Sequence, residues 1–146
     1  MIIKKTENHY LQDTLDQVER LARTYYMDAA PLANLSIQEL FKFVAEYIEY
    51  KKDPPGIELV MRPAYTIRRR AGDCDDKAVL FLAYCQLKNI PCGYSIVSQK
   101  TEKPYHHIFT YLIIDNKRID ADATYNFNRL GESKTWAKRK DFNFIY

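Results

Sequence analysis

A cysteine flanked by acids lies in the most chemically suggestive stretch of the chain, "AGDCDDKAV" at residues 71–79. The first turn of a helix lowers a thiol's pKa and offers a backbone N–H that can bind an oxyanion. Asp73 suits the N-cap position, whereas the charges of Asp75 and Asp76 oppose a lone thiolate. A nucleophile at Cys74 would therefore need an imidazolium partner that offsets these acids.

Two histidines and two aspartates downstream could complete such a site. His106 and His107 are neighbours on an expected strand, so their side chains point to opposite faces and only one can face the helix. Asp120 and Asp122 share a face of the returning strand, which follows a hairpin turn near residues 115–116. A carboxylate there can hydrogen-bond the outer imidazole nitrogen and stabilise the cation. These residue types often fall on adjacent elements by chance, so their order alone does not establish a triad.

The other two cysteines are predicted to be core residues. Cys85 falls in the middle of a helix on its apolar face, and Cys92 is interpreted in the same way, because a free cysteine is more often a small buried residue than a nucleophile. The odd total of three cysteines, with no C-x-x-C, argues against a disulfide framework and a standard zinc knuckle.

Helices are expected in the first part of the chain. Apolar spacing predicts a helix over residues 8–26. A second helix begins after Ser36 with the capping box "SIQE" and ends at the "KKDPPG" stretch, because its prolines cannot continue it. Residues 57–70 show weak periodicity and are expected to form an irregular connection. The third and most apolar helix, over about 74–88, is expected to be central, with residues 75–77 capping and solvating its start.

Strands are expected in the second part. "CGYSIVS" (92–98), "YHHIFTYLII" (105–114) and "RIDADATY" (118–125) predict strands, and the tail "DFNFIY" (141–146) predicts an edge strand because its aromatic residues alternate. Helices followed by an antiparallel sheet are typical of an α+β fold.

The bulk composition limits the class of protein. The 146 residues are 47% hydrophobic and 28% charged, which predicts one globular domain over 1–146. The net charge of +3 is weak, and the basic runs at 68–70 and 138–140 are interpreted as solvated surface, so no nucleic-acid partner is expected. With no apolar run of about 18 residues and no signal peptide, we expect a cytoplasmic protein without a membrane partner. No glycine-rich phosphate loop is present, and no cofactor is implied.

The motifs together resemble the transglutaminase-like superfamily. The resemblance spans about 65–125 and is carried by "RRRAGDCDDKAVLFLAYCQLKNIPCGYSIV" and "HHIFTYLIIDNKRIDADATY". These contain G-D-C before a helix, then N-I-P, a strand, a histidine before two apolar residues, and a hairpin that ends in D-A-T. "DPPGIEL" and "RPAYTIRRRAGDCDDKA" look especially similar to the short bacterial and phage-borne members.

The resemblance implies a papain-like core with a Cys-His-Asp triad. The matching positions are Cys74, His107, which precedes two apolar residues, and Asp122, which precedes Ala-Thr. Asp120 is a substitute if the strand register slips. His106 is left to face solvent or substrate.

An oxyanion hole is also implied by the resemblance. One expected donor is the backbone N–H of Cys74. The second donor in the family comes from an upstream polar or aromatic side chain, for which Tyr50 and Tyr65 are both candidates.

The leading hypothesis is acyl transfer on an amide, with a peptidase or amidase favoured over a crosslinking transglutaminase. A non-catalytic binding or structural module and a zinc site formed by Cys74, His107 and Asp122 are the alternatives. The expected partners are a protein, peptide or cell-wall peptide substrate, with association to a virion if the chain is phage-encoded. The sequence indicates neither the substrate nor the oligomeric state.

Overall fold

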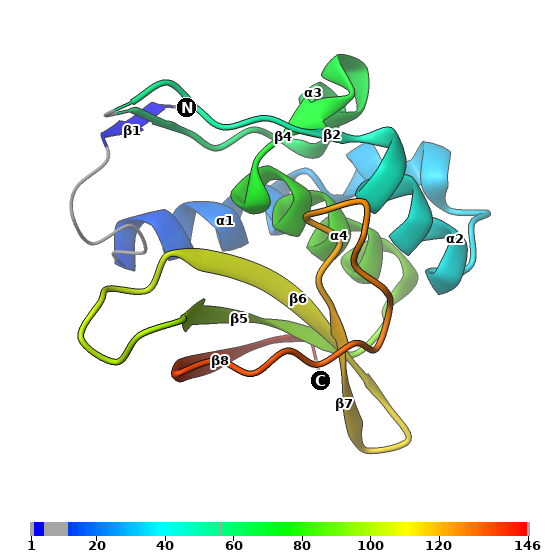
Figure 1. Cartoon of the computed structure of the whole chain (residues 1–146). Coiled ribbons are helices and arrows are strands. Elements are labelled where there is room, and N and C mark those ends of the chain that lie inside the picture. Colours follow the sequence, from blue (N-terminus) through cyan, green and yellow to red (C-terminus); the bar gives the residue numbers. More distant parts are fainter. Residues whose placement is uncertain (1, 5–11, 56, 146) are drawn as a thin grey trace.

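Helices cover one face of a four-stranded antiparallel sheet, and a long connection after the third strand of the sheet runs beside the main helix (Figure 1). The structure is a computed structural model, and it describes residues 2–4, 12–55 and 57–145. The expected α+β architecture is confirmed.

The sheet has the strand order β7-β6-β5-β8. A two-residue turn joins β6 to β7, and its residues Asp115 and Asn116 have φ values of 53° and 64°. Positive φ at both positions is the conformation that Asp and Asn tolerate best among residues with side chains. The predicted edge strand is confirmed as β8, although Tyr146 lies outside the described residues. The strands are β5 (Cys92–Ser98), β6 (His107–Ile114), β7 (Lys117–Ala121) and β8 (Lys138–Ile145).

The central helix is α4 (Cys74–Lys88), which packs on β6 and on the N-terminal helices. Asp73 is its N-cap, and a capping box with Asp76 satisfies amides at the helix start. All of its first twelve residues, from Cys74 to Cys85, are buried. The prediction of a central helix over 74–88 is therefore confirmed, but the expected solvation of its start is wrong.

The N-terminal helices form the layer behind α4 (Figure 1). The predicted first helix is confirmed over α1, while residues 8–11 lie outside the described part. The Ser36 capping box is also confirmed, with the Glu39 N–H donating to Ser36 Oγ at 3.1 Å. None of the described helices combines the length and the apolar character required to cross a membrane. This layer consists of α1 (Gln12–Thr24), η1 (Tyr26–Leu32), α2 (Ile37–Lys42) and η2 (Phe43–Tyr47).

The second helix ends earlier than predicted. Its last turn, η2, stops at Tyr47, and the chain then forms the short strand β2 (Glu49–Tyr50), which pairs in parallel with β4 (Ala71–Gly72). The N–H of Glu49 donates to the Arg70 carbonyl at 2.8 Å, and that of Lys51 donates to the Gly72 carbonyl at 2.9 Å. These bonds to a distant segment, rather than the later prolines, end the helix, and they fix Tyr50 beside the turn that leads to Cys74.

The connection over 57–70 is more regular than predicted. It contains β3 (Ile57–Leu59), which pairs with β1 (Ile2–Lys4), and the short helix α3 (Pro63–Arg69). Pro63 stands in the first turn of α3, where a missing N–H does no harm, and Arg70 ends the helix with φ of 55°. With only seven residues, α3 is too short to give a strong periodic signal.

Candidate active site

Cys74 is the first residue of α4 and is 9% exposed. It lines a small cavity together with Phe109 of β6 and with Ala123 and Thr124, which follow β7. Residues of α4, of β6 and of the chain after β7 therefore surround one cavity. Cys74 stands in the first turn, where backbone N–H groups point along the helix axis toward the site and can bind an anion.

His107 and Asp122 form a buried hydrogen bond, with 2.9 Å between His107 Nε2 and Asp122 Oδ2. The N–H of Thr124 donates to the other carboxylate oxygen at 3.2 Å. Although burial alone would raise the pKa of Asp122, the bonds from His107 and Thr124 hold it below its usual value. The Asp122 carboxylate is thus held in its ionised form beside His107 Nε2. Nδ1 is the nitrogen of the ring that does not bond Asp122.

Aromatic rings surround this imidazole. The rings of Phe109 and Trp136 each lie 5.8 Å from the His107 ring, and Tyr125 stacks on it at 6.3 Å, measured between ring centroids. Tyr125 also lies close enough to Cys74 for a thiolate there to raise the pKa of the phenol, after the larger effect of burial. Tyr125 is therefore a common neighbour of the imidazole and the thiol, which motif matching did not identify.

Asp120 is held by a different partner. Its carboxylate accepts two hydrogen bonds from the Arg139 guanidinium, at 2.8 and 2.9 Å, and one from Ser133 at 3.2 Å. The side chain of Arg139 is only 18% exposed, so the expectation that the 138–140 run is merely solvated surface is wrong at this residue. The alternative in which Asp120 replaces Asp122 is not supported, because it is Asp122 that bonds His107.

The two tyrosine candidates for an oxyanion donor lie in different surroundings. Tyr65 is 51% exposed on α3, where Arg68 lies over its ring. Tyr50 is half-buried, and burial followed by the nearby charge of Cys74 raises the pKa of its hydroxyl. The hydroxyls of Tyr50 and Tyr125 share a hydrogen bond, and their ring centroids are 4.9 Å apart.

His106 is exposed, in contrast to its buried neighbour. Its Nε2 accepts a hydrogen bond from the Gln99 N–H at 3.3 Å, and its ring meets the edge of Trp136. The two histidines therefore occupy opposite environments, as strand alternation predicted.

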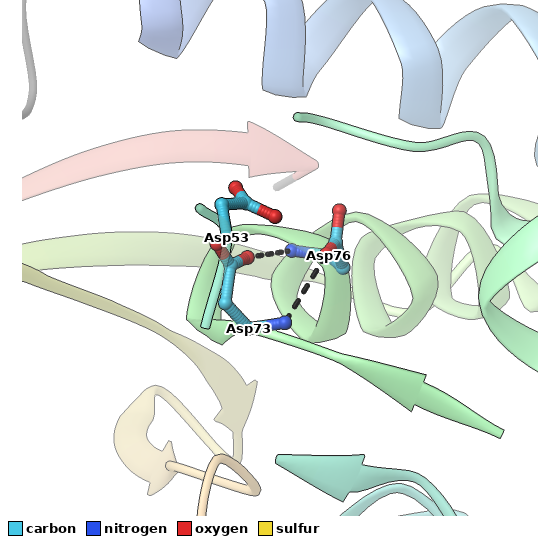
Figure 2. A group of neighbouring side chains, drawn as sticks. All are labelled: Asp53, Asp73 and Asp76. Atoms are coloured by element: carbon cyan, nitrogen blue, oxygen red, sulfur yellow. Dashed lines mark hydrogen bonds between the residues drawn. The ribbon is translucent and has the colours of Figure 1, made fainter. Parts of the chain in front are cut away.

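The acids around Cys74 are buried rather than solvated. Asp76 accepts from the Met61 and Asp73 amides at 2.9 and 3.1 Å, and its own N–H donates to Asp73. Figure 2 shows these two carboxylates beside Asp53. Burial, followed by the neighbouring carboxylates, raises the pKa of Asp73 well above its usual range, and burial also raises that of Asp76. Protons retained by this cluster reduce the negative charge that would oppose a thiolate.

The same cluster is where the described residues could hold a cation. One oxygen from each of Asp53, Asp73 and Asp76 lies within 4.8 Å of the others. Among the described residues, Cys74, His107 and Asp122 do not make such a group, which disfavours the zinc hypothesis for the predicted triad.

Lys77 is buried one turn into α4, where the sequence predicted solvent. Its Nζ donates to the Thr124 carbonyl at 2.8 Å and to that of Ala123 at 3.4 Å. Burial lowers its pKa to about 8, and the charge of Asp122 opposes that shift. Lys77 therefore anchors the segment after Asp122 to the helix that carries Cys74.

Cys85 and Cys92 are core residues, as predicted. Both are at most 1% exposed. The Cys85 thiol hydrogen-bonds to Cys92, and this bond together with burial raises the pKa of Cys85 well above its usual value. Both lie in the core, whereas Cys74 lines a cavity.

Comparison with known proteins places the chain in a family. The transglutaminase-like superfamily matches residues 19–138. A solved candidate cysteine protease from Cytophaga hutchinsonii is similar with 19% identity and a TM-score of 0.47, over 94% of this chain but 45% of that one. LapG of Legionella pneumophila is similar with 15% identity and a TM-score of 0.46, over 80% and 76% of the two chains. No curated protein matches the sequence. Because the family match covers most of its length, the chain belongs to the transglutaminase-like superfamily.

Proposed function

We propose that this protein is a cysteine-dependent acyl-transfer enzyme that hydrolyses amide bonds, with Cys74 as nucleophile, His107 as acid and base, and Asp122 as the group that orients the imidazole. The observation that carries the proposal is the buried His107–Asp122 hydrogen bond of 2.9 Å, which shares its neighbours Phe109 and Tyr125 with Cys74 at the amino end of α4. A His–Asp pair that only stabilised the fold would need no thiol nearby. Acyl transfer needs the thiol, the imidazole and the carboxylate together.

The steps follow from the chemistry of these groups. The Cys74 thiolate attacks the amide carbonyl, a carbon–sulfur bond forms, and the carbon–nitrogen bond breaks as the His107 imidazolium gives its proton to the leaving amine. A water molecule then attacks the thioester while His107 accepts its proton, which releases the acid and regenerates the thiol. Asp122 remains ionised throughout and stabilises the imidazolium.

The oxyanion formed in each step needs two donors. The Cys74 N–H at the start of α4 is one of them. We assign the second to the Tyr50 hydroxyl rather than to Tyr65, because Tyr50 pairs with Gly72 two residues before Cys74, whereas Tyr65 is 51% exposed on α3. Tyr50→Phe removes this donor while keeping the ring.

The acyl acceptor separates hydrolysis from crosslinking. Water gives a peptidase or amidase, and an amine gives a transglutaminase. We favour water because the chain resembles the short prokaryotic members of the superfamily rather than the large crosslinking enzymes. The substrate class is a protein, a peptide or a cell-wall peptide.

Trapping an acyl-enzyme tests the proposal. Peptide and wall-fragment libraries are incubated with the protein and quenched in acid, and the adduct is located by mass. We expect an adduct on Cys74, faster labelling of Cys74 than of Cys85 or Cys92 by iodoacetamide, and slower labelling toward acid pH as the thiolate is lost.

Cys74→Ala should abolish adducts and turnover, whereas the matched variant Cys85→Ala should keep both. A protein inert toward every amide, with equal alkylation of the three native cysteines, would instead identify a non-catalytic module that retains the fold.

A further inference from the structure

A second cavity lies beside the proposed catalytic centre. It has a volume of about 210 Å³ and is lined by residues of η2 and β2, among them Glu46, Glu49 and Tyr50, and by Tyr125 from the connection after β7. Pockets that enclose whole drug-sized ligands measure about 300–1,000 Å³, so this cavity fits part of a substrate, such as one side chain.

The cavity adjoins the one that Cys74 lines. Thr124 lines both this cavity and the one that Cys74 lines. Tyr50 and Tyr125, which form its aromatic wall, are the two phenols whose pKa a thiolate at Cys74 would raise, in addition to the effect of burial. A residue next to an amide bound at Cys74 can therefore reach this cavity.

The charge of the cavity is negative. Glu46 and Glu49 are both exposed at its rim, and within the described part of the chain neither forms an ion pair. No basic residue lines the cavity. This contrasts with Asp28, Asp120 and Asp141, each of which is matched by arginine. Among the described residues, no basic side chain neutralises these two carboxylates through an ion pair, so a cationic group on a ligand could do so.

The aromatic walls of the cavity also favour a cationic ligand. An ammonium or guanidinium group near the face of a tyrosine is attracted by the ring, and its alkyl stem packs on aromatic carbon. The cavity offers two tyrosines together with the two carboxylates. Neutral apolar side chains would use only the rings, and acidic ones would be repelled.

We propose that this cavity is a specificity pocket for a cationic side chain, of the lysine or arginine type, on the acyl side of the scissile amide. The inference rests on the proposed function, since it needs an amide bound at Cys74. We assign the acyl side because the leaving amine must meet His107, which Phe109 and Trp136 flank, whereas the cavity meets this imidazole only through Tyr125.

Peptidyl vinyl sulfones test the pocket directly. In these probes the Cys74 thiolate adds to the vinyl carbon, and the resulting carbanion takes a proton from the imidazolium, which leaves a stable thioether. Each probe is a tripeptide with Lys, norleucine or Glu at one of its three positions. The rate of adduct formation on Cys74 is followed by mass for the unaltered protein, for the double variant Glu46→Gln with Glu49→Gln, and for Glu102→Gln as a control for the loss of an exposed carboxylate outside the cavity.

The expected result is a Lys probe that reacts about tenfold faster than its norleucine analogue, as two exposed charge pairs would give, with the Glu probe slowest. The Lys advantage should fall to about twofold or less in the double variant and persist in Glu102→Gln. Salt gives a second measurement that needs no variant, because ionic strength near 1 M shortens the Debye length to about 3 Å and should reduce the Lys advantage.

Two different failures are distinguishable. If the norleucine probes label Cys74 but Lys is no faster at any position, or its advantage survives in the double variant, the cavity does not select a cationic side chain, and the enzyme proposal stands. If no probe labels Cys74 in the folded protein while iodoacetamide labels it after denaturation, the enzyme proposal fails and the pocket inference fails with it.

Discussion

Asp120 and Asp122 lie two residues apart on the same side of one strand and its exit, yet their surroundings assign them different tasks. Asp122 accepts a hydrogen bond from His107, and Asp120 accepts a bidentate pair from Arg139. The first carboxylate faces the group proposed to move protons, and the second joins the two edge strands of the sheet. The same substitution at the two sites should therefore separate activity from stability.

Asp122→Asn keeps the size of the side chain but removes the charge that stabilises an imidazolium. We expect kcat to fall by about 10³ to 10⁴ with little change in the free energy of unfolding. Turnover of the amide identified by acyl-enzyme trapping, together with denaturant unfolding, measures both quantities.

The matched variant is Asp120→Asn. It should lower the free energy of unfolding by about 3 kcal/mol, because Arg139 is left with an incomplete partner, and keep kcat within about twofold. A loss of turnover in Asp120→Asn that equals the loss in Asp122→Asn would contradict the assignment of Asp122.

At the scale of elements, the residue that caps the amino end of α4 also has a strongly raised pKa. Asp73 caps the helix, and burial, followed by the charges of Asp76 and Asp53, raises its pKa far above the value it has in the unfolded chain. The folded protein thus keeps a proton that the unfolded chain releases near pH 4. The contribution of Asp73 to stability is therefore fully present below about pH 4. It is lost progressively as the pH rises from there to the raised pKa of the folded protein.

Asp73→Asn should remove this decline, because Asn caps a helix as well as Asp and cannot ionise. Relative to the unaltered protein, the variant should gain stability as pH rises above about 4, by up to about 1.4 kcal/mol per pH unit within the window. Urea unfolding at pH 5, 6, 7 and 8 measures the difference between the two curves. Parallel curves would show that the carboxyl of Asp73 titrates normally.

The elements that sequence reasoning identified are those whose signals are local. The capping box at Ser36, the N-cap Asp73 and the Asp115–Asn116 turn each occupy a few consecutive residues, and they indicated the start of two helices and the β6–β7 hairpin. The match to a known family then selected His107 over His106. The pairing of β2 with β4 depends on a segment about twenty residues away, so the end of the second helix was misplaced.

The candidate site was predictable in its ionisable residues and unpredictable in its environment. Burial of Asp76 and Lys77 arises because other segments cover the start of α4, and charged residues at a helix start are usually solvated. The contribution of Tyr125 depends on how the connection after β7 folds back over His107. Such contacts are set by tertiary packing and leave no pattern in the local sequence.

For the molecule as a whole, the sheet depends on one glycine at its centre. Gly93 lies in β5 between β6 and β8, and Tyr111 of β6 reaches across it to donate to the Phe142 carbonyl at 3.0 Å. A Cβ atom at Gly93 would lie 2.2 Å from that carbonyl oxygen and 2.3 Å from the tyrosine hydroxyl. No side chain fits without displacing a neighbouring strand.

Gly93→Ala should therefore lower the free energy of unfolding by at least about 3 kcal/mol. The control is Gly131→Ala, where φ is +85° and the nearest atom to a Cβ would be 3.8 Å away, so that only backbone strain of about 1–2 kcal/mol is expected. Denaturant unfolding of both variants measures the difference. Equal losses would indicate that the strands adjust freely around position 93.

The parallel pair of β2 and β4 links two places that a substrate would touch. Its two hydrogen bonds join the segment of Glu49 and Tyr50 to the turn that precedes Cys74. Occupying the cavity would thereby restrain the thiol, so that affinity gained at one end of a ligand is converted into alignment of the reacting atoms at the other. A truncated substrate lacking the distant group would then be turned over slowly even at saturating concentration.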